Sequence, residues 1–453
     1  MNSKFKNIFR LESKIAFKDI LRISLPIIGG SAVENITAII NTAFLGHVGA
    51  VQLGAVALGG IMYLIFVMLG FGLGIGMQII VARRYGSKQL DKIGEVLYHT
   101  FFIMLLLGLA FLLAGVLFGP SLLRMIVKSD EIYFNLHAFL SFRIWGIGFA
   151  YLNIVFRGFY TGIMRTKVIA VYSIILASVN VFFDYSLIFG HFGFPQMGIA
   201  GAGLSSVIAE FAAMSFFLIF TLFHKEIKAF SITRFAGFKK EVLFNLLKVA
   251  SPVMVQFLIS FGGWFFFFTM VENMGEVPLA ASNLLRTFYM IALLPLWGFS
   301  SATNTLVSYL IGSGRIGEVK KLVLKIMLLS FSSVLMLVLI INIFSAPYLA
   351  IFTNDIGLIR ACFPAFYIVG LSSLLLSLTI VFFNVISGAG KTTVSLFIEF
   401  SVILVYISWA FLVSHVWHSS VAMIWLAEAF YGFTMGSLAL LYLKFGNWRN
   451  AKI

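Results

Sequence analysis

Residues 96–119 read VLYHTFFIMLLLGLAFLLAGVLFG and contain no aspartate, glutamate, lysine or arginine. An α-helix rises about 1.5 Å per residue, so roughly 20 apolar residues cross the hydrocarbon core of a bilayer, which is ~30 Å thick. This stretch is therefore long and apolar enough to span a membrane as one helix. If it is the only such stretch, it could be a buried helix of a soluble protein. If the chain contains many of them, the protein is a polytopic membrane protein.

The rest of the chain repeats the same pattern. Of its 453 residues, 61% are hydrophobic and only 11% are charged, whereas a soluble domain carries about 25% charged residues. Too few charges remain to cover a surface that faces water, so the surface must face lipid. We predict an all-α polytopic membrane protein with twelve transmembrane helices, at residues 20–46, 52–81, 96–119, 134–163, 168–190, 199–223, 246–271, 279–311, 323–346, 361–387, 394–414 and 421–443.

The net charge of +15 follows the expected topology. If the N-terminus is cytoplasmic, the cytoplasmic segments hold 26 of the 32 lysines and arginines, and the outer loops keep only Arg124, Lys128 and Arg360. This asymmetry is the positive-inside pattern. We therefore expect a multi-pass protein of the bacterial inner (plasma) membrane, with both termini in the cytoplasm and no nucleic-acid partner. The stretch from Met1 to Lys18 lacks the apolar core and cleavage site of a signal peptide.

Landmarks in the first half of the chain recur at one constant offset in the second half. Pro252 follows Pro26 by 226 residues (252 − 26 = 226), and the same offset relates Gly86-Ser87 to Gly312-Ser313 and Thr161-Gly162 to Ser387-Gly388. Six helices per repeat bring both halves into the membrane from the same side, as parallel repeats. We predict an N-lobe at 1–223 with helices one to six, a cytoplasmic linker at 224–245 and a C-lobe at 246–453 with helices seven to twelve.

The cysteine and histidine content gives no sign of a metal or a cofactor. Cys362 is the only cysteine, which excludes an intramolecular disulfide and any site with several cysteine ligands. The seven histidines form no cluster with metal-ligand spacing. We expect no cofactor and no metal other than a coupling ion.

Several short motifs occur in order along the chain. They are Leu25-Pro26 with NTAFLG at 41–46, ARRYGS at 82–87, Phe156-Arg157-Gly158 to Thr166-Lys167, Asn180-x-x-x-Asp184-Tyr185 with LIFG at 187–190, and GFP at 193–195 with GAG at 201–203. Together with the twofold spacing, these motifs resemble the multidrug and toxic compound extrusion (MATE) family over almost the whole chain. The Asn180 and Asp184 pair is similar to the DinF-like branch of that family.

The resemblance implies an exporter of lipophilic, often cationic drugs or toxic compounds, driven by inward flow of H⁺ or Na⁺. It also implies a cation site in the N-lobe, built from an acid on the first helix, Asn and Asp on the fifth, and a hydroxyl on the sixth. Here Asn180 and Asp184 match the fifth-helix pair and Ser206 is the expected hydroxyl, while Asn41 stands at the position of the acid. A Na⁺ ion would lie at Asp184, Asn180 and Asn41. Another branch has a seventh-helix acid where this chain has Ser260, which puts coupling in the C-lobe in doubt.

The positions of intramembrane polar residues point independently to the same lobe. Counted from the cytoplasmic basic residues at about 1.5 Å per residue, Glu34 lies roughly 18 Å deep, Asn41 28 Å, Asn180 20 Å and Asp184 25 Å. Glu34 and Asn41 share one helix face, and so do Asn180 and Asp184. A carboxylate at such depth is costly and usually functional or paired. We expect Asp184, Asn180, Glu34, Asn41 and Ser206 to couple transport to a cation, with Glu34 replacing the charge missing at Asn41.

Other interpretations of the buried charges remain open. Asp184 could instead pair with Arg143, which is predicted at a similar depth on the fourth helix. Glu210, Glu399 and Glu428 are also intramembrane, and for each a structural hydrogen bond is as good an explanation as a functional role.

A second group of residues is predicted to bind substrate or to gate. Pro26 could bend the first helix, because proline removes a backbone hydrogen bond and clashes with the preceding turn. Arg143 and Arg286 could offset acids or gate the cavity. Trp264, in the aromatic run 264–268, could hold a lipophilic cation against its ring, and Gln256 is a further candidate.

Competing functions share parts of this pattern. A lipid-linked oligosaccharide flippase of the same superfamily is the main alternative, although such proteins tend to have more helices and a more basic cavity. A major-facilitator transporter would carry an acidic-Arg-Gly-Arg-Arg signature that the loop at 82–92 lacks. No paired acids for a membrane enzyme were identified, so we expect no enzymatic activity. The expected partners are small amphiphilic or cationic substrates and membrane lipid, and the protein is expected to be a monomer.

Overall fold

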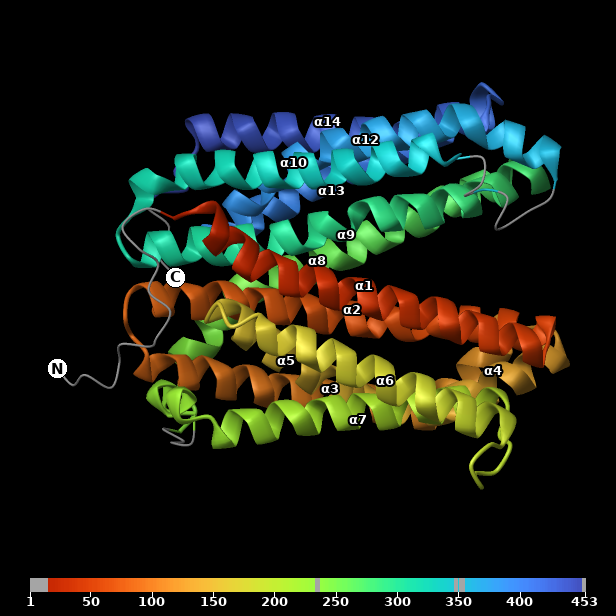
Figure 1. Cartoon of the computed structure of the whole chain (residues 1–453), viewed down its shortest axis with the longest axis horizontal. Helices are drawn as coiled ribbons and strands as arrows, with labels where there is room; N and C mark the ends of the chain where they lie inside the picture. Colours follow the sequence, from red (N-terminus) through yellow and green to blue (C-terminus); the bar gives the residue numbers. More distant parts are fainter. Residues whose placement is uncertain (1–14, 233–236, 346–348, 350–354, 450–453) are drawn as a thin grey trace. The chain divides into compact units, whose positions relative to one another are not determined.

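The computed structural model describes residues 15–232, 237–345, 349 and 355–449. In these ranges it is almost entirely helical and contains no β-strand. The α-helices are α1 (Phe17–Val48), α2 (Ala50–Gly86), α3 (Asp91–Ile126), α4 (Asp130–Arg143), α5 (Ile147–Gly162), α6 (Lys167–Phe189), α7 (Ile199–Phe223), α8 (Lys240–Glu272), α9 (Glu276–Gly312), α10 (Val319–Ile343), α12 (Ile356–Gly388), α13 (Thr392–Phe411) and α14 (Val421–Phe445) (Figure 1).

Twelve helical spans in the described ranges are long and apolar enough to cross a membrane, which confirms the predicted fold class and number of spans. α4 and α5 together make one span, because they are joined only by a 3₁₀ turn at Ile144–Gly146. Large apolar side chains lie on the outer faces of the helices. On α3, for example, Leu105 is 48%, Leu113 51% and Leu117 66% exposed. A surface of this kind is suited to lipid, because lipid tails are as apolar as leucine.

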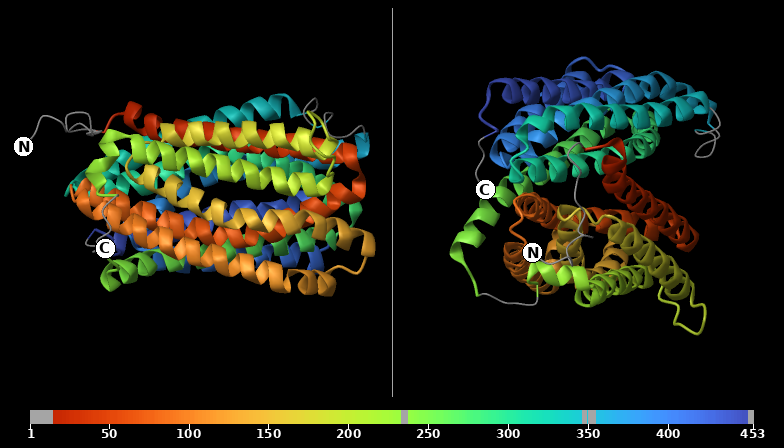
Figure 2. Two further views of the ribbon diagram at one scale, coloured as in Figure 1. Left: turned by 90° about the horizontal axis from the view of Figure 1, so that it is seen from below. Right: turned by 60° about the vertical axis from the view of Figure 1, so that its left-hand side comes forward.

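The described residues form two compact units. The first unit comprises Gly29–Ala250, and the second comprises residues 15–28 and 251–449. The helices within each unit run along a common direction (Figures 1 and 2). The unit boundaries differ from the predicted lobes, because residues 15–28 lie in the second unit and residues 224–250 in the first.

Both repeats therefore begin with a helix that is shared between the units. The first turns of α1 pack on α9 in the second unit, where a methyl group at Gly298 would lie 3.0 Å from the Ser24 carbonyl oxygen. In the first unit, the first turns of α8 pack on α2, where a methyl group at Gly76 would lie 2.6 Å from Ala250 Cα. α1 stays helical through Pro26, and the division between units falls just after it, between Ile28 and Gly29. A role for Pro26 in bending α1 stays a prediction.

Close helix contacts at glycines hold the first unit together. A methyl group at Gly158 of α5 would lie 2.7 Å from the Gly74 carbonyl oxygen of α2. Because backbone cannot move aside as a flexible side chain can, this contact requires glycine. It sets the distance between α5 and α2, and the N-terminal part of the same span carries Arg143.

Aromatic rings pack together in the core of the second unit. Phe267 of α8 is fully buried and lies against Tyr406 and Trp425, at ring-centroid distances of 5.3 and 5.4 Å. Its neighbours Phe265 and Phe266 are 60% and 54% exposed. The aromatic run 264–268 therefore contributes one ring to the core and turns others outward.

Candidate functional site

A chain of hydrogen bonds in the first unit links α1, α6 and α7. Asn41 Nδ2 of α1 donates to Asn180 Oδ1 of α6 at 2.8 Å, and Asn180 Nδ2 donates to Ser205 Oγ of α7 at 3.4 Å. Ser205 Oγ in turn donates to Asp184 Oδ1 of α6. Asn180 and Asp184 share one face of α6 because they are four residues apart. The structure thus brings together three of the five predicted coupling residues: Asn41, Asn180 and Asp184.

Ser206 is not the hydroxyl of this cluster. It donates to the Ala202 carbonyl oxygen at 3.1 Å, whereas its neighbour Ser205 is fully buried and contacts both Asn180 and Asp184. Adjacent residues of a helix point about 100° apart, so only one of the two serines can face α6. The hydroxyl that bonds to Asn180 and Asp184 is therefore Ser205, one position before the predicted Ser206, and a coupling role for Ser206 stays a prediction.

Asp184 combines deep burial with incomplete hydrogen bonding. The residue is 1% exposed, and its Oδ2 atom has no hydrogen-bond partner among the described residues. Asn41 Oδ1 also lacks a partner there. A buried carboxylate without a partner is costly, and a bound proton or cation would remove that cost. Oxygen atoms of carboxylates and amides are the ligands that hard cations prefer, so these residues fit either ion.

Glu34 does not join this cluster. Its Oε1 lies 3.3 Å from an Arg157 guanidinium nitrogen and accepts a hydrogen bond from Ser173 Oγ at 2.9 Å. The charge of Glu34 is therefore offset by Arg157 of α5, and its predicted role in coupling stays a prediction. Arg157 was not predicted as this partner, although a depth count could have suggested it. Arg157 lies about 12 Å from the cytoplasmic residue Arg165 along its helix, and Glu34 lies at a depth of roughly 18 Å.

Arg143 is also paired, but not with Asp184. Its two terminal nitrogens donate to the carboxylate of Glu210 on α7 at 2.6 and 3.0 Å, and its guanidinium lies 3.8 Å from the centre of the Tyr63 ring. The alternative in which Arg143 neutralises Asp184 is therefore excluded. For Glu210, the sequence left open a structural hydrogen bond or a functional role, and its contacts with Arg143 are of the structural kind.

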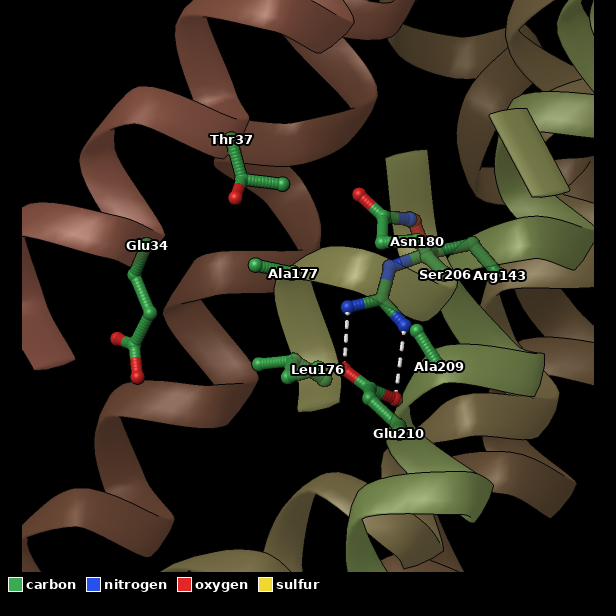
Figure 3. Close-up of a pocket in the computed structure, with 9 residues that line it drawn as sticks. All are labelled: Glu34, Thr37, Arg143, Leu176, Ala177, Asn180, Ser206, Ala209 and Glu210. Atoms are coloured by element: carbon green, nitrogen blue, oxygen red, sulfur yellow. Dashed lines mark hydrogen bonds and ion pairs between the residues drawn. The ribbon is translucent and has the colours of Figure 1, made fainter. Parts of the chain in front are cut away.

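A cavity of about 160 Å³ adjoins the cluster. Figure 3 shows Glu34 at one side of it and the Arg143–Glu210 pair toward the other, with Asn180 and Ser206 near Arg143 on the lining. Pockets that hold drug-sized ligands have about 300–1,000 Å³, so this cavity is too small for such a ligand. Its size and its polar lining suit an ion with a few waters, next to the Asn180 end of the hydrogen-bonded chain.

Two of the three predicted gating or substrate residues of the second unit share a neighbour, and the third, Gln256, does not contact it in the described interactions. Trp264 and Arg286 both meet Phe268, at 5.1 Å between ring centroids and 5.6 Å from guanidinium to ring centre. Gln256 is half-buried on α8 and accepts a hydrogen bond from Ser260 at its backbone carbonyl. These contacts leave their predicted roles in gating or substrate binding untested.

A model of the MatE family matches this sequence twice, at residues 26–186 and at 252–412. The second match begins 226 residues after the first (252 − 26 = 226), which is the offset found between the repeated motifs.

Relatives and solved structures are similar along much of the chain. A probable multidrug resistance protein NorM of Synechocystis sp. is 25% identical over 284 residues, covering 62% of this chain and 61% of the relative. A probable multidrug resistance protein NorM of Thermotoga maritima is 22% identical over 401 residues, covering 84% and 82%. An outward-facing structure of a multidrug resistance MATE family transporter of the MOP superfamily has a TM-score of 0.88 at 20% identity, covering 94% of this chain and 95% of that one. This last likeness shows the fold.

Proposed function

The chain belongs to the MatE family, whose model matches more than half of its residues, and on this premise we propose that it is a cation-coupled multidrug antiporter. It exports lipophilic, often cationic compounds across the bacterial inner membrane while H⁺ or Na⁺ moves inward. The relatives named as multidrug resistance proteins support the substrate class. The distribution of basic residues supports cytoplasmic termini, and we propose that the protein acts as a monomer.

One observation carries the coupling part of the proposal. Asp184 is 1% exposed, and one of its carboxylate oxygens has no partner among the described residues. The nearby bases Arg143 and Arg157 are each committed to another acid. A carboxylate in this setting favours uptake of a positive charge. The ion that enters would be the charge carrier of the antiport.

The hydrogen-bonded chain links the ion-binding residue Asp184 to α1, so ion binding can change the conformation of that helix. Asp184 contacts Ser205, Ser205 contacts Asn180, and Asn180 contacts Asn41 on α1. α1 belongs to both units, since its first turns lie in the second unit. Neutralising Asp184 weakens the hydrogen bond that Ser205 donates to it, because donors bind the anionic form more strongly. The change then reaches, through Asn180 and Asn41, the helix that the two units share.

Replacing Asp184 by asparagine tests the proposal. Asn keeps the shape and one oxygen but cannot ionise, so Asp184→Asn in proteoliposomes should export ethidium at the background rate under either an H⁺ or a Na⁺ gradient. The matched control is Asp130→Asn. The side chain of Asp130 is 74% exposed and pairs with Arg124 at the surface. That variant should export at the wild-type rate.

Two outcomes would overturn the proposal. Wild-type export by Asp184→Asn would remove the cation site from this cluster. Failure of the wild-type protein to move any lipophilic cation, combined with translocation of a lipid-linked oligosaccharide, would establish the flippase instead. Imposing the two gradients separately identifies the coupling ion.

A further inference from the structure

The second unit contains two buried carboxylates with no basic partner. Glu399 of α13 is 1% exposed and Glu428 of α14 is 4% exposed. Neither forms an ion pair with a lysine, arginine or histidine among the residues that the structure describes. Two uncompensated negative charges inside one unit of a membrane protein are costly, so their contacts decide which of them takes up a proton.

Glu428 has hydroxyl donors on both oxygens. Tyr289 donates to its Oε2 at 2.5 Å and Tyr406 to its Oε1 at 3.0 Å. Hydrogen bonds of this kind stabilise the charged form of a carboxylate. Glu428 is therefore the better satisfied of the two acids.

Glu399 is satisfied on one oxygen only. Ser260 of α8 donates to its Oε1 at 2.5 Å, and Tyr431 of α14 donates to the same atom at 2.8 Å. No hydrogen bond to Oε2 is formed by any residue in the described ranges.

The Ser260–Glu399 pair occupies the same two repeat positions as the Glu34–Ser173 pair of the first unit, with the acid on the other helix. Ser260 and Glu399 are 139 residues apart, and so are Glu34 and Ser173. The offset of 226 makes Ser260 the equivalent of Glu34 and Glu399 the equivalent of Ser173 (260 − 34 = 226; 399 − 173 = 226). Each unit thus keeps one carboxylate bound by one serine at equivalent positions.

The two units differ in what neutralises that carboxylate. Glu34 has Arg157 at 3.3 Å, whereas the position equivalent to Arg157 is Phe383 in the second unit (383 − 157 = 226). The second unit thus has an acid in this pair but a phenylalanine at the position of the base. Glu399 therefore needs another positive charge.

The environment of Glu399 matches that of Asp184 instead. Tyr431 lies on α14, the helix after α13, just as Ser205 lies on α7, the helix after α6. In each unit a hydroxyl on this helix binds one oxygen of a buried acid. Asp184 Oδ2 has no hydrogen-bond partner among the described residues, and the hydrogen bonds of Glu399 in the described ranges both go to Oε1. A hydroxyl from the sixth span of each repeat thus binds an acid that has no basic partner.

We propose that Glu399 is a second, exchangeable proton-binding site, held by Ser260 and Tyr431 in the second unit. H⁺ binds at Oε2 and converts the carboxylate to a neutral acid, while Oε1 continues to accept the two hydroxyl hydrogen bonds. The site adds a proton to the antiport proposed above, and its existence does not depend on Asp184.

Infrared titration of the full-length protein in lipid, with H⁺ as the only ligand, tests the site without transport. Glu399→Gln should lose one protonated carboxyl carbonyl band that disappears reversibly as the pH rises from about 5 to about 9. It should also take up about one proton fewer per molecule when the pH is lowered across that range. Glu276→Gln, an exposed glutamate at the start of α9, is the matched control and should keep the band.

Two further variants keep the test decisive. Asp184→Asn should leave the Glu399 band in place, so failure of the first-unit site and failure of this one are separate results. Tyr431→Phe keeps the carboxyl but removes a donor to its anionic form, so the pH at which the band disappears should shift upward. The proposal is overturned if Glu399→Gln loses no band, or if the band it loses does not respond to pH in the wild type.

Discussion

Ser205→Ala measures how much the hydroxyl identified by the structure contributes to the cation site. Ser205 is fully buried, donates to Asp184 Oδ1 and accepts from Asn180 Nδ2 at 3.4 Å. A hydrogen bond to a charged group contributes about 1.5–3 kcal/mol, and each 1.4 kcal/mol is a factor of about ten in an equilibrium constant. The variant should therefore change the cation concentration for half-maximal ethidium export by about ten- to a hundredfold. For H⁺ the change is toward lower proton concentration, because the donor that stabilises the anion is lost.

Ser206→Ala is the matched control for this experiment. Ser206 donates only to the backbone carbonyl of Ala202 one turn earlier, at 3.1 Å. Its loss should change the half-maximal concentration by no more than about twofold, as for substitutions outside a hydrogen-bonded network. The assay is initial export rate in proteoliposomes over a series of internal and external pH or Na⁺ values. An equal effect of the two substitutions, or a larger effect of Ser206→Ala, would refute the assignment of Ser205.

The remaining predictions concern stability and orientation. Glu210→Gln should destabilise the protein by about 3–5 kcal/mol in denaturant titration, because it leaves the Arg143 guanidinium buried without its partner, whereas Asp130→Asn in an exposed pair should cost less than about 1 kcal/mol. A Glu210→Gln loss as small as that of Asp130→Asn would show that another group neutralises Arg143. In a Cys362→Ser background, chosen because Cys362 is buried, Gln89→Cys should react with an impermeant thiol reagent only from the cytoplasm and Asn273→Cys only from outside. Both positions are exposed between helices, and reversed labelling at both would invert the proposed topology.

The residue pattern alone was sufficient for the fold class. Length and apolarity of a span are local properties, since a helix satisfies its own backbone hydrogen bonds in lipid. The twelve spans were for this reason predictable one at a time. The offset of 226 residues predicted the repeat, because equivalent positions of a duplicated fold keep their spacing. The pairing of Asn180 with Asp184 on one face followed from helix periodicity.

Contacts between helices required the tertiary structure. Sequence depth placed Glu34 beside Asn41, Asn180 and Asp184, yet the carboxylate lies against Arg157 and Ser173. Arg143 was a candidate partner for Asp184, yet it is bound to Glu210. Ser205, not Ser206, faces α6. Depth fixes only the position of a residue along its helix, whereas the rotation of each helix about its axis is set by packing, and about 100° of rotation separates one residue from the next.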